Sequence, residues 1–95
     1  MNFATYPSLE DATVYITGGA SGIGAEIVRA FADQRSRIGF LDFDVVRGDA
    51  LTAELREQGA DVHFEPCDLR DIDALRQAFV SLEATLGPAT VLING

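Results

Sequence analysis

The sequence of 95 residues contains no lysine and no tryptophan, and it has a single cysteine. That cysteine, Cys67, excludes an internal disulfide framework and favours a reducing compartment. All seven basic residues are arginines, and against fifteen acidic residues they leave a net charge of −8, which disfavours binding to nucleic acid or to an anionic membrane. No apolar run reaches the length of a membrane span, and the first residues lack the basic and apolar regions of a signal peptide. We therefore expect a cytoplasmic protein whose partners are neither nucleic acid nor membrane.

Short β-branched runs alternate with longer segments of helical period along the chain. This alternation predicts strands at 12–17, 37–42, 61–65 and 90–93, and helices at about 22–34, 45–58 and 72–86. Strands and helices that alternate with short connections call for a parallel sheet with helices on both faces. In a dinucleotide-binding arrangement, the strands lie in the order 3-2-1-4. The predicted fold class is therefore α/β, a Rossmann-type doubly wound parallel sheet represented by its first four strands.

The apolar periodicity also predicts which side chains the helices bury, and Asp44 and Asp71 are placed as N-caps of the second and third helices. The fourth strand, Val91-Leu92-Ile93, has the continuous apolar character of a strand buried on both faces. The residues predicted to face the core are Ile23, Ile27, Val28 and Phe31 in the first helix, Val46, Ala50, Leu51 and Leu55 in the second, and Ile72, Leu75, Phe79, Leu82 and Leu86 in the third.

The segment Thr17-Gly18-Gly19-Ala20-Ser21-Gly22-Ile23-Gly24 joins the first predicted strand to the first predicted helix. Such a junction directs unpaired backbone N–H groups and the positive end of the helix dipole towards one point, which suits a phosphate or pyrophosphate. Its spacing, G-x-x-x-G-x-G, differs from the common dinucleotide pattern G-x-G-x-x-G, and Ala25 stands where a Walker A loop requires lysine. The alternative is a strand-to-helix turn that merely needs glycine at positive φ.

Polar residues stand at the ends of the later strands: Asp42 ends the second, Asp68 follows the third and Asn94 follows the fourth. A carboxylate at Asp42 can accept hydrogen bonds from both hydroxyls of an adenosine ribose and repels a 2′-phosphate, so NAD is favoured over NADP. Asp68 is placed to meet the exocyclic amine of adenine. Each residue also has a structural alternative: Asp42 as a solvated strand-end acid or a cap for the next turn, Asp68 as an Asx turn, and Asn94 as a bridge between strand ends.

Three motifs resemble the short-chain dehydrogenase/reductase family. Thr17–Gly24 resembles its TGxxxGIG signature, Cys67-Asp68-Leu69 its adenine-contacting Asp-Val/Leu step, and Leu92-Ile93-Asn94-Gly95 the opening of its Asn-Asn-Ala-Gly segment. The resemblance implies an oxidoreductase that transfers hydride between NAD and an alcohol or carbonyl substrate, and a homo-oligomer, either dimeric or tetrameric. It further implies cofactor contacts from Gly18, Ser21, Gly22, Ile23, Gly24, Asp42, Asp68, Leu69, Asn94 and Gly95.

The family's catalytic Ser, Tyr and Lys lie beyond the fourth strand, and neither Tyr6 nor Tyr15 has lysine four residues later. We therefore expect no catalytic residue in this chain. By the family's usual length, we expect the chain to be the N-terminal part of a single NAD(P)-binding domain, inactive by itself, with residues 1–11 as a lead-in. At Arg35-Ser36 the family commonly has Gly-Ala, a difference expected to affect the end of the first helix but not the ligand.

Two other functions remain open. A non-catalytic nucleotide-sensing module on the same scaffold would lack a Tyr-x-x-x-Lys motif further along its reading frame. A methyltransferase dependent on S-adenosylmethionine also uses a glycine turn and acids after its second and third strands, although it usually ends its first strand with an acid. His63 is interpreted as a packed or surface histidine and Cys67 as a small buried residue, and no metal site is predicted.

Overall fold

The computed structural model describes residues 11–94. Within this range the elements are, in chain order, β1 (Thr13–Thr17), α1 (Gly22–Asp33), β2 (Arg37–Asp42), α2 (Val45–Glu57), β3 (Val62–Pro66), α3 (Ile72–Leu86) and β4 (Val91–Asn94). Each boundary lies within one residue of the range predicted from the sequence. Of the predicted lead-in at 1–11, all but Asp11 lies outside the described residues.

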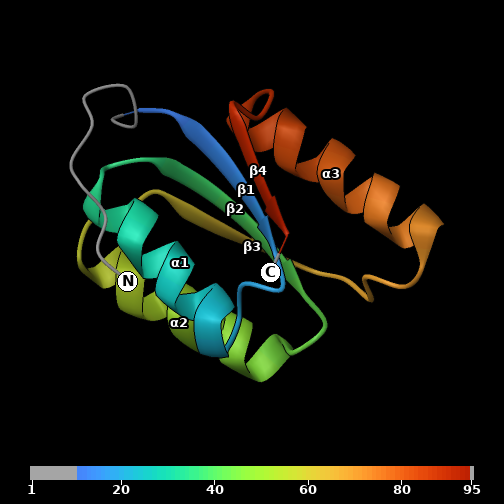
Figure 1. The fold of residues 1–95 in the computed structure, drawn as a ribbon, viewed down its shortest axis with the longest axis horizontal. Coiled ribbons are helices and arrows are strands. Elements are labelled where there is room, and N and C mark those ends of the chain that lie inside the picture. Colours follow the sequence, from blue (N-terminus) through green and yellow to red (C-terminus); the bar gives the residue numbers. More distant parts are fainter. Residues whose placement is uncertain (1–10, 95) are drawn as a thin grey trace.

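In the described range, four parallel strands form one sheet in the order β3-β2-β1-β4. Helices α1 and α2 cover one face of this sheet, and α3 covers the other (Figure 1). Strand β1 lies between β2 and β4, with Tyr15 opposite Gly39 on one side and Leu92 on the other. The arrangement confirms the predicted α/β class, the helices on both faces and the strand order.

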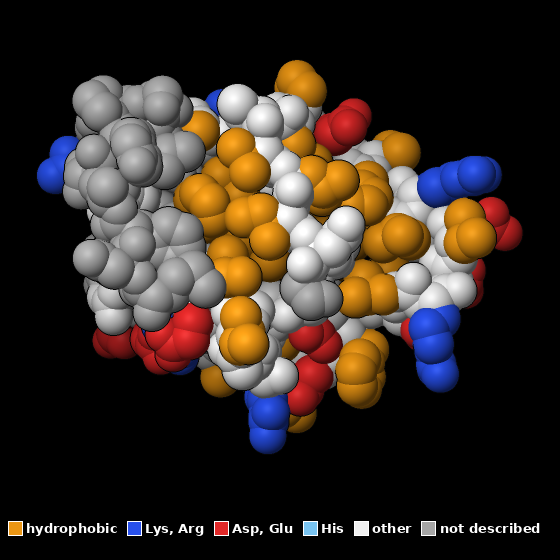
Figure 2. Space-filling view, in the orientation of Figure 1, with side chains coloured by type: hydrophobic (Ala, Val, Ile, Leu, Met, Phe, Trp, Pro, Cys, Tyr) orange, Lys and Arg blue, Asp and Glu red, His pale blue; other side chains and the backbone are white. Residues whose placement is uncertain are grey.

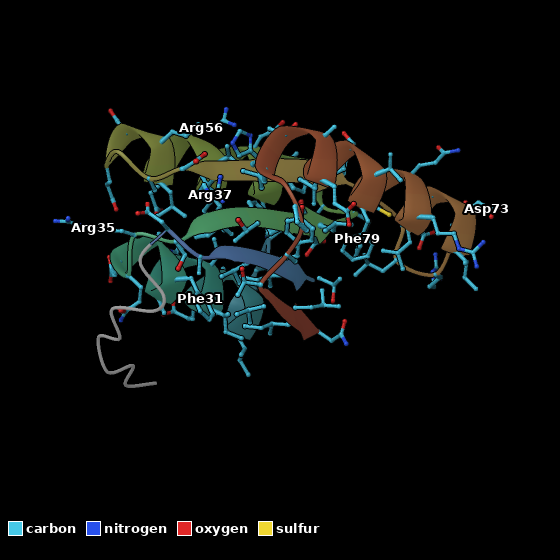
Figure 3. The ribbon with its side chains drawn as sticks, turned by 90° about the horizontal axis from the view of Figure 1, so that it is seen from above. Phe31, Arg35, Arg37, Arg56, Asp73 and Phe79 are labelled. Atoms are coloured by element: carbon cyan, nitrogen blue, oxygen red, sulfur yellow. The ribbon has the colours of Figure 1, made fainter. Side chains whose placement is uncertain are left out.

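Successive residues of the central strands supply the two halves of the core, since they point to opposite faces of the sheet. Val14 and Ile16 belong to the apolar cluster under α1 and α2, whereas Tyr15 and Leu41 belong to the cluster under α3. The ring of Tyr15 stacks on that of Phe79 with 5.9 Å between centroids, and Figure 3 shows Phe79 between α3 and the sheet. Both central strands, β1 and β2, are therefore covered on both faces.

Three residues in the first turns of the helices, and one in the middle of α2, differ from the sequence prediction. Ile23 in α1 is 73% exposed, Val46 in α2 is 80% exposed and Ile72 in α3 is 63% exposed, and Ala50 is exposed as well. The prediction that these four residues face the core is therefore wrong. Ile23 and Ile72 lie in the first turns of their helices, at the edge where the strands end. The apolar face that each helix has in the sequence therefore extends past the end of the sheet, and its first residue is exposed.

In α2 the inward face is set by a close contact with β3. A Cβ atom on Gly48 would lie 2.2 Å from Cζ of Phe64, so only glycine allows the helix to pack this near the strand. With Gly48 turned inward, Leu51 and Leu55 are buried as predicted, while Val46 lies on the opposite side of the helix.

Helices α1 and α2 end in the same kind of turn. Gly59 after α2 has φ of 87°, and Arg35 after α1 has φ of 62°. At α1 the N–H of Ser36 returns to the carbonyl of Phe31 at 3.2 Å, which closes the helix end in the usual left-handed turn. Arg35 stands where the family commonly has glycine, and it was expected to affect the helix end. The turn is nevertheless intact, at a backbone cost of about 1 kcal/mol. Figure 3 shows Arg35 pointing away from the sheet.

Strand β4 carries apolar surface that the described residues leave uncovered. Leu92 is 57% exposed, and Val91 and Ile93 are half-buried, so the described residues do not bury this strand on both faces. Within residues 11–94, β4 pairs with β1 alone. Figure 2 shows hydrophobic side chains gathered over the sheet between α1 and α3.

Candidate functional site

The carboxyl ends of the four strands of the described range lie along one edge of the sheet, and Figure 1 shows the β1–α1 loop at this edge. The parallel register places Thr17 beside Leu41 and Asn94, and Asp42 beside Pro66. The polar residues predicted at strand ends are therefore brought to one side of the molecule. An edge of this kind, where the strand order reverses beside β1, is where ligands bind in open α/β sheets.

The glycine-containing loop, residues 18–24, is fixed by β2 and by its own close packing. The N–H of Gly18 donates to the carbonyl of Leu41 at 2.7 Å, and φ is 74° at Gly18 and 58° at Gly22. A Cβ atom on Gly24 would lie 1.8 Å from the carbonyl oxygen of Gly18, so no larger residue fits there. The glycine at position 24 thus sets how closely α1 approaches the loop. A turn that needs glycine only for its positive φ would not require this close contact.

Helix α1 begins without a side-chain cap. Its N-cap, Ser21, makes no capping hydrogen bond to the described residues, and the first turn has no acidic residue. By contrast, the carboxylate of Asp44 accepts the N–H of Arg47 at 3.0 Å at the start of α2, and that of Asp71 accepts the N–H of Ala74 at 3.1 Å at the start of α3. The first N–H groups of a helix have no partner inside it, so the start of α1 presents donors and a positive dipole end to an anion.

Asp42 links the glycine-containing loop to the turn after β2. Its side chain is buried, with 7% exposure; Oδ2 accepts the N–H of Ala20 at 3.1 Å and Oδ1 accepts the N–H of Asp44 at 3.0 Å. The structural alternative considered for Asp42, a cap for the next turn, is therefore present. Each carboxylate oxygen has a second lone pair, so these bonds leave acceptors for a ligand hydroxyl.

A cavity of about 430 Å³ adjoins the end of β2 and is lined by Phe43, Asp68, Leu69 and Arg70. Phe43 is 77% exposed, so its ring offers an uncovered apolar wall. The Asx turn considered for Asp68 is also present, because Oδ1 accepts the N–H of Arg70 at 3.0 Å. Hydrogen bonds from the Arg70 side chain and backbone hold the pKa of Asp68 below its usual value. An apolar slot with one ionised carboxylate suits a flat base that carries an amino group.

Asn94, at the end of β4, is tied to the end of β1. Its Oδ1 accepts the hydroxyl of Thr17 at 3.0 Å, so it bridges strand ends as the structural alternative required. Gly95, the last predicted site residue, lies outside the described residues.

A larger cavity, of about 510 Å³, lies away from the glycine-containing loop, where α1 and α2 end. It contains none of the predicted site residues. Its lining is Asp11, Ala32, Asp33, Arg35, Ser36, Arg37, Gln58, Gly59, Ala60 and Asp61.

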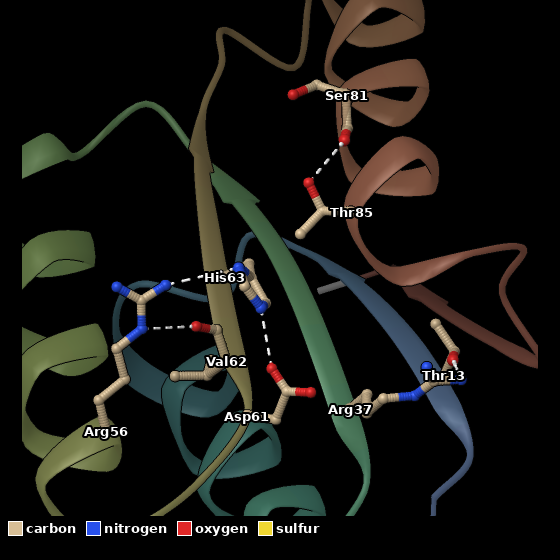
Figure 4. A network of polar contacts seen from close by, with 8 residues as sticks. All are labelled: Thr13, Arg37, Arg56, Asp61, Val62, His63, Ser81 and Thr85. Atoms are coloured by element: carbon tan, nitrogen blue, oxygen red, sulfur yellow. Dashed lines mark hydrogen bonds and ion pairs between the residues drawn. The ribbon is translucent and has the colours of Figure 1, made fainter.

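Cys67 is buried and His63 is half-buried, and neither is among the residues of the candidate site. Cys67 is buried, and burial raises the pKa of its thiol, which opposes a role as nucleophile. His63 lies on β3 with Nε2 2.8 Å from the Asp61 carboxylate and Nδ1 3.4 Å from Arg56 (Figure 4). Among residues 11–94, no group of three His, Cys, Asp or Glu side chains is placed to hold a metal ion.

Tyr15 packs against α3 and does not face the candidate site. Its hydroxyl donates to the carbonyl of Gly87 after α3, and burial raises its pKa. This geometry agrees with the sequence argument that Tyr15 is not a catalytic tyrosine.

Sequence reasoning overlooked Phe43 and Arg70, which line the cavity at the ends of β2 and β3. A signal was present for both, since an aromatic residue directly follows Asp42 and an arginine stands two positions after Asp68. The bond from Ala20 to Asp42 had no such signal, because it uses a backbone N–H.

A doubly wound sheet whose first strand leads through a tight glycine loop to an uncapped helix, with an acid at the end of the second strand, is the arrangement of dinucleotide-binding α/β proteins. The sequence profile described as short chain dehydrogenase matches residues 12–95. The chain belongs to this family.

Named relatives and solved structures agree with this assignment. The chain is 42% identical over 90 residues to the Rhizobium meliloti protein named "Probable galactose dehydrogenase GalD", covering 94% of this chain and 35% of that protein. It is 39% identical over 94 residues to D-xylose 1-dehydrogenase of Caulobacter vibrioides, covering 99% of this chain and 36% of that protein. The F189W actinorhodin polyketide ketoreductase with NADPH matches with a TM-score of 0.85 and 27% identity, over 90% of this chain and 33% of that one. The chain thus spans about a third of the length of the curated relatives it matches.

None of the helices in residues 11–94 combines the length and the apolar composition of a membrane span.

Proposed function

We propose that this chain forms the cofactor-binding portion of an NAD-dependent oxidoreductase acting on an alcohol or carbonyl substrate. The observation that carries the proposal is the uncapped start of α1 beside the buried carboxylate of Asp42. The first offers N–H donors for a pyrophosphate, and the second offers acceptors for ribose hydroxyls. NAD, when bound, would supply the hydride acceptor or donor.

The residues fit such a cofactor because the loop is closely packed before any ligand arrives. Ser21, Gly22, Ile23 and Gly24 would face the pyrophosphate, because they form the start of α1. Gly18 would act through its carbonyl, against which Gly24 packs. In the same proposal Asp68 and Leu69 hold the adenine, and Asn94 and Gly95 begin the wall on the nicotinamide side.

NAD in preference to NADP follows from the charge at the end of β2. A buried carboxylate that already accepts two N–H bonds cannot turn away from a 2′-phosphate without releasing the loop. The next residue, Phe43, offers no positive charge to compensate. The fold alone does not set this choice, since one solved structure of similar fold, the F189W actinorhodin polyketide ketoreductase, is a structure with NADPH.

The substrate is proposed only as a class. Two relatives are named for galactose and D-xylose, so aldoses are the first compounds to assay. We propose that proton transfer depends on the family's Ser, Tyr and Lys, which residues 11–94 do not supply, so residues 1–95 alone would be inactive. A homo-oligomer remains a prediction from the family resemblance.

Calorimetric titration of the complete protein that contains this chain with NAD, NADP and S-adenosylmethionine tests the proposal. We expect NAD to bind about tenfold or more tightly than NADP, a difference of at least about 1.4 kcal/mol. In Asp42→Asn, which can still accept the Ala20 N–H, the preference should shift towards NADP by about tenfold. Asp42→Ala should also lower the free energy of unfolding by about 2 kcal/mol, because two N–H groups lose a charged acceptor.

Tighter binding of S-adenosylmethionine than of either dinucleotide would overturn the proposal. An unchanged NAD preference in Asp42→Asn would overturn the role of Asp42 alone.

A further inference from the structure

Strand β3 has a free outer edge in the part of the chain that the structure describes. There it pairs with β2 alone, and the carbonyl of Asp61, just before the strand, accepts the N–H of Ile38 on β2 at 2.9 Å. Successive residues of a strand direct their backbone groups to alternate sides. The residues whose backbone groups point away from β2 are therefore Val62, Phe64 and Pro66. Such a row of outward N–H and C=O groups is a template for pairing with another strand.

The outer edge of β3 is complementary to the same edge of a second copy. Pro66 has no N–H, so Val62 and Phe64 are the outward residues of β3 that carry both a donor and an acceptor. In an antiparallel pairing with the two-fold axis at His63, Val62 of each copy would face Phe64 of the other. Residues opposed in this way exchange both of their N–H···O bonds, and the axis generates two such pairs. An axis at Phe64 would instead set the Val62 carbonyl opposite proline, which has no donor.

Arg56, in the last turn of α2, occupies this edge. Its Nε donates to the carbonyl of Val62 at 2.9 Å, and its Nη2 lies 3.4 Å from Nδ1 of His63 (Figure 4). A guanidinium can only donate, so Nδ1 is the acceptor and the ring proton is on Nε2, which lies 2.8 Å from Oδ1 of Asp61. The guanidinium is thus held on the Val62 carbonyl by groups of β3 and of the residue before it.

We propose that the outer edge of β3 is a self-association surface that Arg56 keeps closed. The guanidinium takes the Val62 carbonyl, which the Phe64 N–H of a second copy would need. The two-fold axis at His63 would also bring the Arg56 side chains of both copies close together, and like charges opposed across a strand pair are destabilising. The partner that fits the edge is a second copy of this chain, admitted when Arg56 is removed. This inference does not depend on the proposed function.

A role of Arg56 in helix stability alone predicts a different outcome. A cation in the last turn of a helix interacts favourably with the negative end of the helix dipole, and Arg56 has this position in α2. In that case, any association of Arg56→Ala would follow from lost stability, and an equally destabilised variant would associate as well. Asp71→Ala, which removes the cap of α3, provides that control. Arg76→Ala controls for charge, since it removes an arginine from an exposed position on α3.

Sedimentation velocity of the complete protein that contains this chain, at increasing concentration, tests the inference. We expect the association constant of Arg56→Ala to exceed that of the wild type about tenfold or more, because a carbonyl in each copy gains a donor and the opposed charges are gone. Arg56→Lys keeps a cation that can donate to the Val62 carbonyl, so it should associate far less than Arg56→Ala. Hydrogen exchange at the Phe64 N–H should slow as the concentration of Arg56→Ala rises, and should be independent of concentration in the wild type.

The controls Arg76→Ala and Asp71→Ala should sediment as the wild type does. No added association in Arg56→Ala would overturn the inference, and so would equal association in Asp71→Ala. Association of Arg56→Ala with no change in exchange at Phe64 would also overturn it, since the contact would then lie away from β3. None of these results bears on the proposed function, which cofactor titration tests separately.

Discussion

Helix α1 and helix α3 begin in opposite ways. The carboxylate of Asp71 occupies the start of α3, where it accepts the N–H of Ala74, and α2 begins likewise with Asp44. Helix α1 begins at Ser21 with no capping bond to the described residues and no acid in its first turn. At α2 and α3 a carboxylate of the chain itself caps the first turn and stabilises the helix. At α1 the first turn has no such cap, and this is where we propose that the anion of a ligand binds. A Ser or Asp cap is worth about 1 kcal/mol, so the open start of α1 is a measurable loss of stability.

The largest effect is expected at the glycine that brings the start of α1 against the loop. Gly24→Ala would place a Cβ 1.8 Å from the carbonyl oxygen of Gly18. The loop or the helix must move, so we expect NAD binding to be lost and the free energy of unfolding to fall by about 3 kcal/mol. Chemical denaturation and calorimetric titration measure the two effects.

Gly22→Ala is the matched control for Gly24→Ala. A Cβ there meets nothing within 4 Å, although φ is 58°. Its cost should be that of backbone strain alone, about 1 kcal/mol. Equal destabilisation by the two substitutions would mean that close packing at Gly24 does not set the loop.

A smaller effect, opposite in sign for stability and binding, is expected when α1 is given the cap of its neighbours. Ser21→Asp would place a carboxylate where it can accept the N–H groups of the first turn, so the free energy of unfolding should rise by up to about 1 kcal/mol. The same charge would repel a pyrophosphate, so NAD affinity should fall about tenfold or more. Ser21→Asn caps without charge and should lose less affinity. Tighter NAD binding in Ser21→Asp would contradict the proposed anion site.

The smallest effect is expected at the start of α3. Asp71→Ala should lower the free energy of unfolding by about 1 kcal/mol and leave the dissociation constant of NAD unchanged. Asp71→Asn, which can still accept the Ala74 N–H, should lose less stability. A loss of NAD affinity in Asp71→Ala would break the comparison, since it would give a capped helix a part in the site.

Strand order and element boundaries could be predicted because they follow from local periodicity, from capping residues such as Asp44 and Asp71, and from the short connections. The inward faces of the helices were less accessible to sequence reasoning. Val46 was predicted to be buried because it is apolar, but the contact between Gly48 and Phe64 sets the rotation of α2. That contact joins two elements, and periodicity within one of them carries no information about it.

The candidate site also contains residues that the sequence identified and residues that it did not. Gly24, Asp42 and Asp68 were identifiable because strand ends in a parallel sheet share an edge and because the loop spacing is unusual. Their partners were not, since Ala20 acts through its backbone and Arg70 through a pairing that only the turn after β3 brings about.

The two bonds accepted by Asp42 have an evolutionary consequence. If the proposed preference for NAD holds, a lineage that changes to NADP has to remove the negative charge at this position, yet the same carboxylate holds the loop at Ala20 and the turn at Asp44. Replacement by an aliphatic residue would change the cofactor at the expense of the loop. A viable route therefore passes through a neutral side chain that still accepts hydrogen bonds, such as asparagine or serine, before any arginine appears nearby. Cofactor exchange in this chain is thus constrained by the order of substitutions as much as by their identity.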